Sequence, residues 1–144
     1  MIDDAAVTAR LSEVRRLVLT TAKMYYDLAA ARGDAAGTEI ALARVDELYP
    51  WPGEMVAAIV DRYPNLEDVV WAQEEPKNMG AWTYVAPQLR VATGNMLTVR
   101  YIGRPERASP AEGYDIVHKE EQKRVVREVL TLAPAGSKRR TSKV

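Results

Sequence analysis

The sequence lacks cysteine and phenylalanine, and it has a single histidine among its 144 residues. The absence of cysteine excludes disulfides, thiol nucleophiles and cysteine-ligated metal sites, and it is consistent with a reducing compartment. One histidine with neighbouring carboxylates does not make a structural zinc site without further ligands. Without phenylalanine, the aromatic packing depends on three tryptophans and seven tyrosines.

The glycine patterns of common nucleotide-binding loops are also absent. The eight glycines occupy positions 33, 37, 53, 80, 94, 103, 113 and 136, so no G-x-G pair exists and no P-loop or dinucleotide fingerprint follows the first strand. No apolar run reaches the roughly 18 residues of a membrane span, and the first four residues are acidic rather than signal-like. Twenty basic and twenty acidic residues cancel. We therefore expect neither nucleic-acid nor membrane binding.

Apolar runs alternate with helical patterns along the chain. The expected strands are residues 15–20, 40–45, 68–72 and 97–102. The expected helices are residues 24–30, 54–63, a segment after Asn78 that is broken or kinked at Pro87, and 114–132. This alternation predicts a parallel sheet in an α/β fold with three layers, α/β/α.

The length suits one domain. We expect residues 15–132 to form it, preceded by a linker or edge segment over residues 1–14. Residues 133–144 are basic and lack apolar periodicity, so we expect a disordered tail.

The densest group of chemically versatile side chains follows the third expected strand. Gln73, Glu74 and Glu75 lie at its carboxyl end, where α/β domains commonly meet a ligand or partner. Adjacent strand residues point to opposite faces, so the two acids are a poor general acid/base pair. We expect one carboxylate at the start of the next helix and the other toward solvent or a partner.

The rest of this stretch predicts a strand–turn–helix corner. Pro76 has no N–H for further ladder pairing, Asn78 can cap the next helix, and Trp82 is an apolar anchor suited to an interface.

A second candidate region combines basic side chains with the histidine. Arg100, Arg104 and Arg107 surround a polar loop that also contains Ser109, and three guanidinium groups near a strand end can hold a phosphate or carboxylate. The alternative is surface ion pairing of low energy. For His118, the alternatives are a surface hydrogen bond to a carboxylate or to the preceding loop, and a subunit-interface contact.

Four segments together resemble the C-terminal domain of the 2-oxoglutarate dehydrogenase E1 component. They are LTTAKMYYDL (residues 19–28), RVDELYPWP (44–52), VWAQEEPKNMGAW (70–82) and GRPERASPAEGY (103–114), followed by His118. The resemblance covers residues 15–130, and the run W-x-Q-E-E-P-x-N-x-G-A-W makes it specific. One position departs from the family pattern, which usually has Ser-Gly-Lys where this chain has Thr21-Ala22-Lys23.

The resemblance implies a transketolase-type C-terminal domain with a mostly parallel sheet of about five strands, usually with one antiparallel edge strand. In that family it is the third domain of a thiamine-diphosphate enzyme. The whole enzyme, part of the tricarboxylic acid cycle, oxidatively decarboxylates 2-oxoglutarate and passes the succinyl group to the lipoyl arm of the E2 partner, dihydrolipoyl succinyltransferase. The diphosphate, magnesium and catalytic histidines belong to the two preceding domains.

By resemblance, we therefore expect no catalytic, cofactor-binding or metal-binding residue in this chain and no activity from it alone. Its expected partners are the remaining E1 domains, the second E1 subunit of a homodimer and, indirectly, E2, in the bacterial cytoplasm. Two alternatives remain open. One is a free-standing ligand-binding or regulatory module that uses the arginine loop, and the other is the E1 of a different 2-oxoacid.

Overall fold

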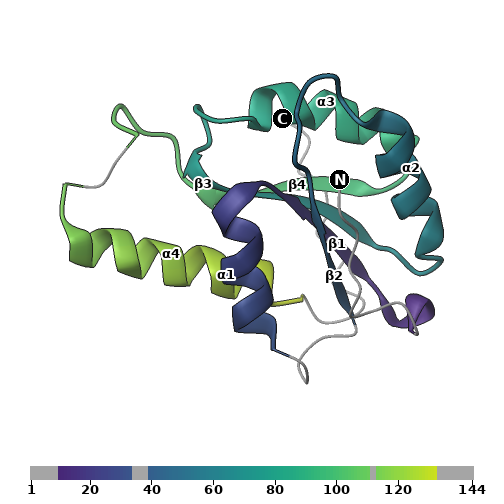
Figure 1. The fold of residues 1–144 in the computed structure, drawn as a ribbon, viewed down its shortest axis with the longest axis horizontal. Coiled ribbons are helices and arrows are strands. Elements are labelled where there is room, and N and C mark those ends of the chain that lie inside the picture. The colour runs from purple at the N-terminus through teal and green to yellow at the C-terminus, as the bar shows by residue number, and fades with distance from the viewer. Residues whose placement is uncertain (1–9, 34–38, 111–112, 133–144) are drawn as a thin grey trace, which may run out of the picture.

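The computed structural model of the chain describes residues 10–33, 39–110 and 113–132. Its centre is a sheet of four parallel strands in the order β2–β1–β3–β4 (Figure 1). The strands are β1 (Arg16–Thr20), β2 (Ile40–Arg44), β3 (Asp68–Pro76) and β4 (Thr98–Arg104). β1 and β3 are central, and their first five residues are almost entirely buried, as expected for a sheet covered on both faces.

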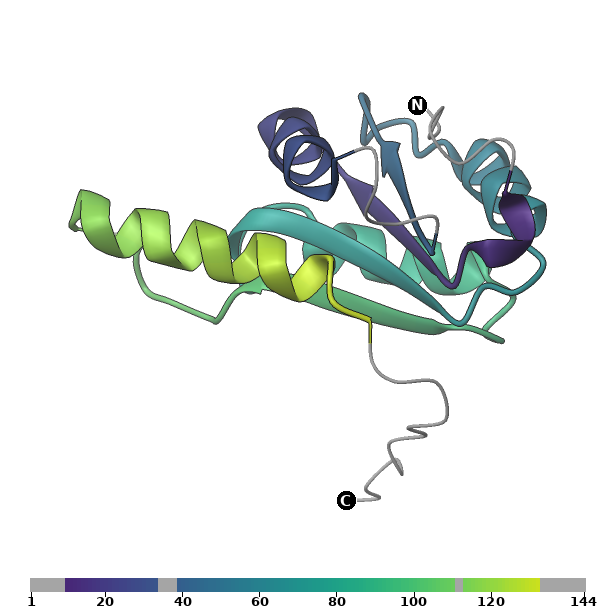
Figure 2. The same cartoon turned by 90° about the horizontal axis from the view of Figure 1, so that it is seen from below.

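Four α-helices cover the two faces of this sheet (Figures 1 and 2). They are α1 (Ala22–Arg32), α2 (Gly53–Arg62), α3 (Trp82–Ala92) and α4 (Asp115–Val129). Apolar side chains of α1 and α4 pack on one face, around Leu28 and Val125, whereas those of α2 and α3 pack on the other, around Val56 and Leu89. The predicted three-layer α/β/α architecture is confirmed, and no helix in the described part of the chain is long and apolar enough to cross a membrane.

Three details of the fold differ from expectation. The described residues form four strands rather than about five, all parallel, with no antiparallel edge strand among them. β3 continues past Ala72 to Pro76, with a register irregularity between these two residues. The neighbouring β4 extends equally far, and its Arg104 carbonyl accepts a hydrogen bond from the Lys77 N–H. α3 is not broken at Pro87. Pro87 and Thr83 are both exposed, so the Thr83 carbonyl that loses a helical donor lies on the solvent side.

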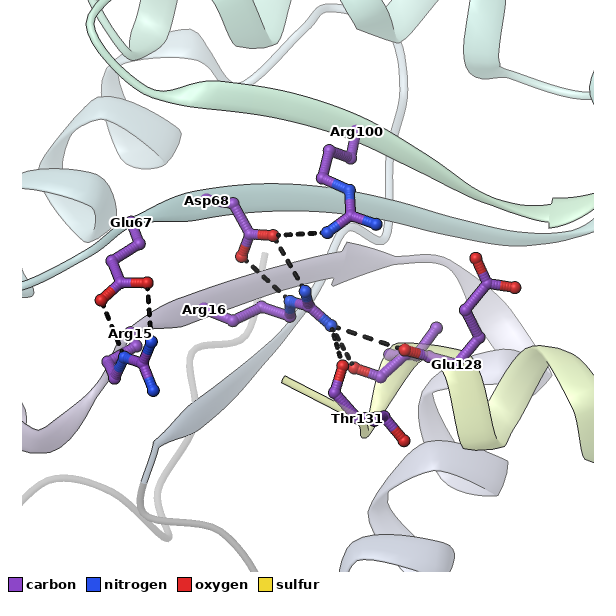
Figure 3. Close-up of polar contacts among 8 residues, drawn as sticks. Arg15, Arg16, Glu67, Asp68, Arg100, Glu128 and Thr131 are labelled. Atoms are coloured by element: carbon purple, nitrogen blue, oxygen red, sulfur yellow. Dashed lines mark hydrogen bonds and ion pairs between the residues drawn. The ribbon is translucent and has the colours of Figure 1, made fainter. Parts of the chain in front are cut away.

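A buried arginine joins α4 to the amino end of the sheet (Figure 3). Arg16 is 2% exposed, and its Nε and Nη2 donate to the two carboxylate oxygens of Asp68 at 2.9 Å each. Its Nη1 donates to the carbonyls of Val129 at 2.9 Å and Thr131 at 3.0 Å, where the helix dipole favours a cation. The C-terminal end of α4 is thereby fixed to β1 and β3.

The turn from β1 into α1 contains a strained residue. Ala22 has φ +47°, in the left-handed region where a Cβ costs about 1–2 kcal/mol. At this position the family that the sequence resembles usually has glycine, which adopts a positive φ without this cost.

Ala22→Gly is predicted to stabilise the chain by about 1 kcal/mol, because it relieves this backbone strain. Urea unfolding followed by circular dichroism measures the change. Ala30→Gly is the matched control, an exposed position inside the same helix, and it should destabilise by about 1 kcal/mol. Equal destabilisation by both substitutions would show that the backbone at Ala22 is not strained.

Candidate functional site

The candidate residues of the β3–α3 corner are organised around Gln73, whose side chain is buried inside the corner. Its Oε1 accepts hydrogen bonds from the Trp71 indole Nε1 at 2.8 Å and from the backbone N–H of Trp82 at 3.1 Å. Its Nε2 donates to the Met79 carbonyl at 2.8 Å and lies 3.2 Å from the Pro76 carbonyl. One amide therefore connects the strand, the turn and the first residue of α3.

The turn closes tightly over this amide. Gly80 has φ +65°, and a Cβ built on it would lie 2.9 Å from Nε2 of Gln73 and 3.1 Å from the Cβ of Glu75. Such contacts are too short for any side chain without displacement of the corner. Glycine is required here both by the backbone conformation and by the space.

The prediction that Asn78 caps α3 is wrong. The helix begins at Trp82, and its flanking residue Ala81 makes no side-chain cap bond. Asn78 instead lies outside the helix, where its Nδ2 donates to the Arg107 carbonyl at 2.9 Å and its Oδ1 accepts from the Arg107 N–H at 3.0 Å. Asn78 thus joins the β3–α3 turn to the loop after β4, and Gln73 takes over the bond at the helix start.

The two adjacent acids diverge, as predicted from strand geometry. Glu74 is half-buried beside α1, with its Oε1 3.4 Å from the Nζ of Lys23, which also contacts Asp27. Glu75 is exposed, and its Cβ lies on the side of Gly80. The N–H of Trp82, the first residue of α3, donates to Oε1 of Gln73, so the helix-start role expected for one of the two carboxylates belongs to Gln73.

Tyr101 also holds this corner together, a role that was not predicted from the sequence. Its phenolic oxygen lies 2.9 Å from the Glu75 carbonyl and 2.7 Å from the Arg104 carbonyl, and its ring packs on Trp82 at 5.5 Å between centroids. Burial, aided by the charge of Glu75, raises the pKa of Tyr101 to about 12. Alternation along β4 is the signal that could have placed this side chain toward α3.

The three arginines do not converge on one loop. Arg100 lies near the amino end of β4, where its Nη1 is 3.2 Å from the Oδ2 of Asp68. Arg104 ends the strand and is buried, while Arg107 and Ser109 lie on the exposed loop beyond it. The prediction that all three arginines bind one phosphate or carboxylate together is therefore wrong.

His118 contacts Arg104, which was expected in the preceding loop and which the structure places at the end of β4. The residue is exposed on α4, and its Nδ1 lies 2.9 Å from Nη2 of Arg104. Because guanidinium groups only donate, the imidazole accepts through an unprotonated Nδ1.

Several of these polar side chains are already used in bonds within the corner. Gln73, Asn78 and Tyr101 are used in bonds that hold the corner together. Within the described ranges, no three or more histidine, aspartate or glutamate residues are grouped so as to hold a metal ion. In this corner Glu75 is exposed, whereas Trp82 is partly buried and packs on Tyr101.

Gly80→Ala should destabilise the chain by about 2–4 kcal/mol, because it combines left-handed strain with the clash against Gln73. Thermal and urea unfolding measure the loss. Gly94→Ala is the control, since Gly94 has a similar φ of +59° but its nearest neighbour, the Cε of Met96, is 3.5 Å away. We expect Gly94→Ala to lower the free energy of unfolding by about 1 kcal/mol, the cost of the left-handed conformation alone. A loss as large as that of Gly80→Ala would contradict the inference that the turn closes tightly over Gln73.

The raised pKa of Tyr101 predicts a specific loss of stability in alkali. The phenol stays protonated to about pH 12 in the folded chain but ionises near pH 10 when unfolded, so its contribution is complete below pH 10 and is lost as the pH rises toward 12. Urea unfolding between pH 9 and 12 should show a shallower decline for Tyr101→Phe than for the wild type. Tyr84→Phe, on the exposed side of α3, should decline like the wild type.

Comparison with known proteins identifies the family. The family described as 2-oxoglutarate dehydrogenase C-terminal matches residues 1–130. The chain is 46% identical over 133 residues to the 2-oxoglutarate dehydrogenase E1 component of Exiguobacterium sp., covering 91% of this chain and 14% of that protein. It is 45% identical over 132 residues to the E1 component of Geobacillus kaustophilus, with the same two coverages.

A third relative, the E1 component of Bacillus licheniformis, is 45% identical over 129 residues, which cover 88% of this chain and 14% of that protein. The chain thus spans about one seventh of the length of these relatives. The family match extends over nearly all of the described fold, including the β3–α3 corner and His118. The chain belongs to the family of C-terminal domains of the 2-oxoglutarate dehydrogenase E1 component.

Proposed function

We propose that the chain is an assembly domain of a 2-oxoglutarate dehydrogenase E1, which supports the cofactor-binding domains and the subunit contacts and performs no chemistry alone. The observation that carries this proposal is the exposed amino-terminal half of α4. The helix extends beyond the sheet (Figures 1 and 2), and residues 115–120 are all exposed.

Apolar side chains lie on this uncovered part of α4. Tyr114, directly before the helix, and Ile116 are each 77% exposed, and Val117 is 42% exposed. Grouped exposed apolar residues commonly mark an interaction surface. The buried side chains of α4, Val125 and Val129, lie only in its second half. The first half of the helix therefore has the character of a surface that another domain or subunit covers.

The proposed partners follow from the names of the relatives. Those proteins are about seven times as long as this chain, so the proposed neighbours of α4 are the preceding E1 domains and the second subunit of a homodimer. Thiamine diphosphate and magnesium would bind in those preceding domains, and E2 would receive the succinyl group from them. A bacterial cytoplasmic location is part of the same proposal.

Two alternative functions have less support. A free-standing module built on three converging arginines conflicts with the separation of Arg100 from Arg104 and Arg107. An E1 for a different 2-oxoacid is less favoured, because the similar E1 components carry the 2-oxoglutarate name.

The proposal is tested by exchanging this chain for the matching domain of the Geobacillus kaustophilus E1. We expect the chimera to reduce ferricyanide in a 2-oxoglutarate-dependent reaction, and the isolated chain to give no turnover. In the chimera, Ile116→Asp should weaken subunit assembly at least tenfold in analytical ultracentrifugation, since it places a charge in an apolar contact.

The control variant is Lys119→Glu, which changes charge on the same exposed helical segment without removing an apolar group. The isolated Ile116→Asp chain should unfold at the wild-type temperature, because the side chain is exposed there. Unchanged assembly of the Ile116→Asp chimera would refute a docking role for α4, and turnover by the isolated chain would refute the assembly role as a whole.

A further inference from the structure

Arg104 is a buried cation with few partners. The residue is 4% exposed at the end of β4, and its Nη2 lies 2.9 Å from Nδ1 of His118. Its Nε is buried and has no hydrogen-bond partner. Across the described part of the chain, no carboxylate forms an ion pair with Arg104.

Arg16, a second buried arginine on this face of the sheet, shows what Arg104 lacks. Arg16 is buried to the same degree, but both oxygens of Asp68 and two backbone carbonyls at the end of α4 satisfy it. A buried charge without a counter-ion carries a large desolvation cost, whereas a paired one recovers much of it. Arg104 therefore lies in a position that an anion would complete.

The surroundings of Arg104 favour a negative group. Arg124 is bound to Glu121 at 3.1 Å, and that hydrogen bond, together with the charges of Arg124, Arg107 and Arg104, lowers the pKa of Glu121. Glu121 thus already has a partner in Arg124.

The histidine orients this cation and can contribute a donor. Because Nδ1 of His118 accepts from Arg104, the neutral ring carries its proton on Nε2, and the residue is exposed. A guanidinium with an unused N–H is a donor suited to a carboxylate or a phosphate oxygen.

We propose that Arg104 and His118 form a binding site for an oxyanion, a phosphate or carboxylate group, at the carboxyl end of β4. The group can come from a small molecule in solution or from an acidic side chain of a second copy of the chain. His118 follows Val117 on the same exposed part of α4, but phosphate binding by the isolated chain and subunit assembly of the chimera are measured separately, so either proposal can fail without the other.

The first test measures the unfolding temperature of the 144-residue chain with and without 50 mM inorganic phosphate. The wild type should rise by about 3 °C or more, as linkage requires for a ligand that binds the folded state. Arg104→Met should be as stable as the wild type or more stable without phosphate, and should not respond to it. Arg127→Gln, an exposed arginine on α4, should respond like the wild type.

The second test uses the single histidine as a probe of the site. Its ring resonances in proton NMR are unambiguous, so phosphate titration should shift them saturably in the wild type and in Arg127→Gln, but not in Arg104→Met. If phosphate has no effect, a concentration-dependent association that Arg104→Met weakens at least tenfold would assign the anion to a second copy.

Each of the following results overturns the proposal. One is the absence of both a phosphate response and an Arg104-dependent association. The other is a phosphate response that Arg104→Met retains in full, which would place the bound ion elsewhere. A marked destabilisation by Arg104→Met together with an unresponsive wild type would likewise show that Arg104 is satisfied without an anion.

Discussion

The corner between β3 and α3 depends on one buried amide. Gln73 receives two hydrogen bonds from Trp71 and Trp82 and donates to the carbonyls of the turn. Water cannot replace these bonds without opening the corner, so losing the amide would leave several polar groups unpaired at once. The same constraint explains Gly80, because any side chain there would occupy the space of the amide. A stretch with the composition of an active site is therefore largely used to hold its own shape.

The two ends of α4 have different roles, and the difference connects the fold to the proposed function. The second half of the helix is buried against the sheet, and its last carbonyls are held by Arg16. The first half extends past the sheet with its apolar side chains uncovered. A domain that fixes one end of a helix and exposes the other is suited to presenting that helix to a neighbour.

Local patterns in the sequence predicted the strands, the helices, the three layers and the divergence of Glu74 and Glu75, because each depends on the period of a single element. The errors concerned contacts between distant segments. Asn78 binds the backbone of Arg107, 29 residues away, and no local capping rule anticipates such a bond. Arg100 and Arg104 are close in sequence, but four residues of strand separate them by about 13 Å. Their neighbours, Asp68 and His118, come from different elements and became known only from the fold.

The one-sided attachment of α4 has a consequence for how its docking would be regulated. Local opening of a helix costs least where its side chains have few packing contacts, so the first turns of α4 open more readily than the last. A partner that binds those turns must offset the entropy of ordering them, which lowers its affinity but leaves the contact reversible. Hydrogen bonds in the last turns, held by Arg16, would keep their protection throughout. α4 would then be least ordered in its exposed first turns and most ordered in its last turns, next to the sheet.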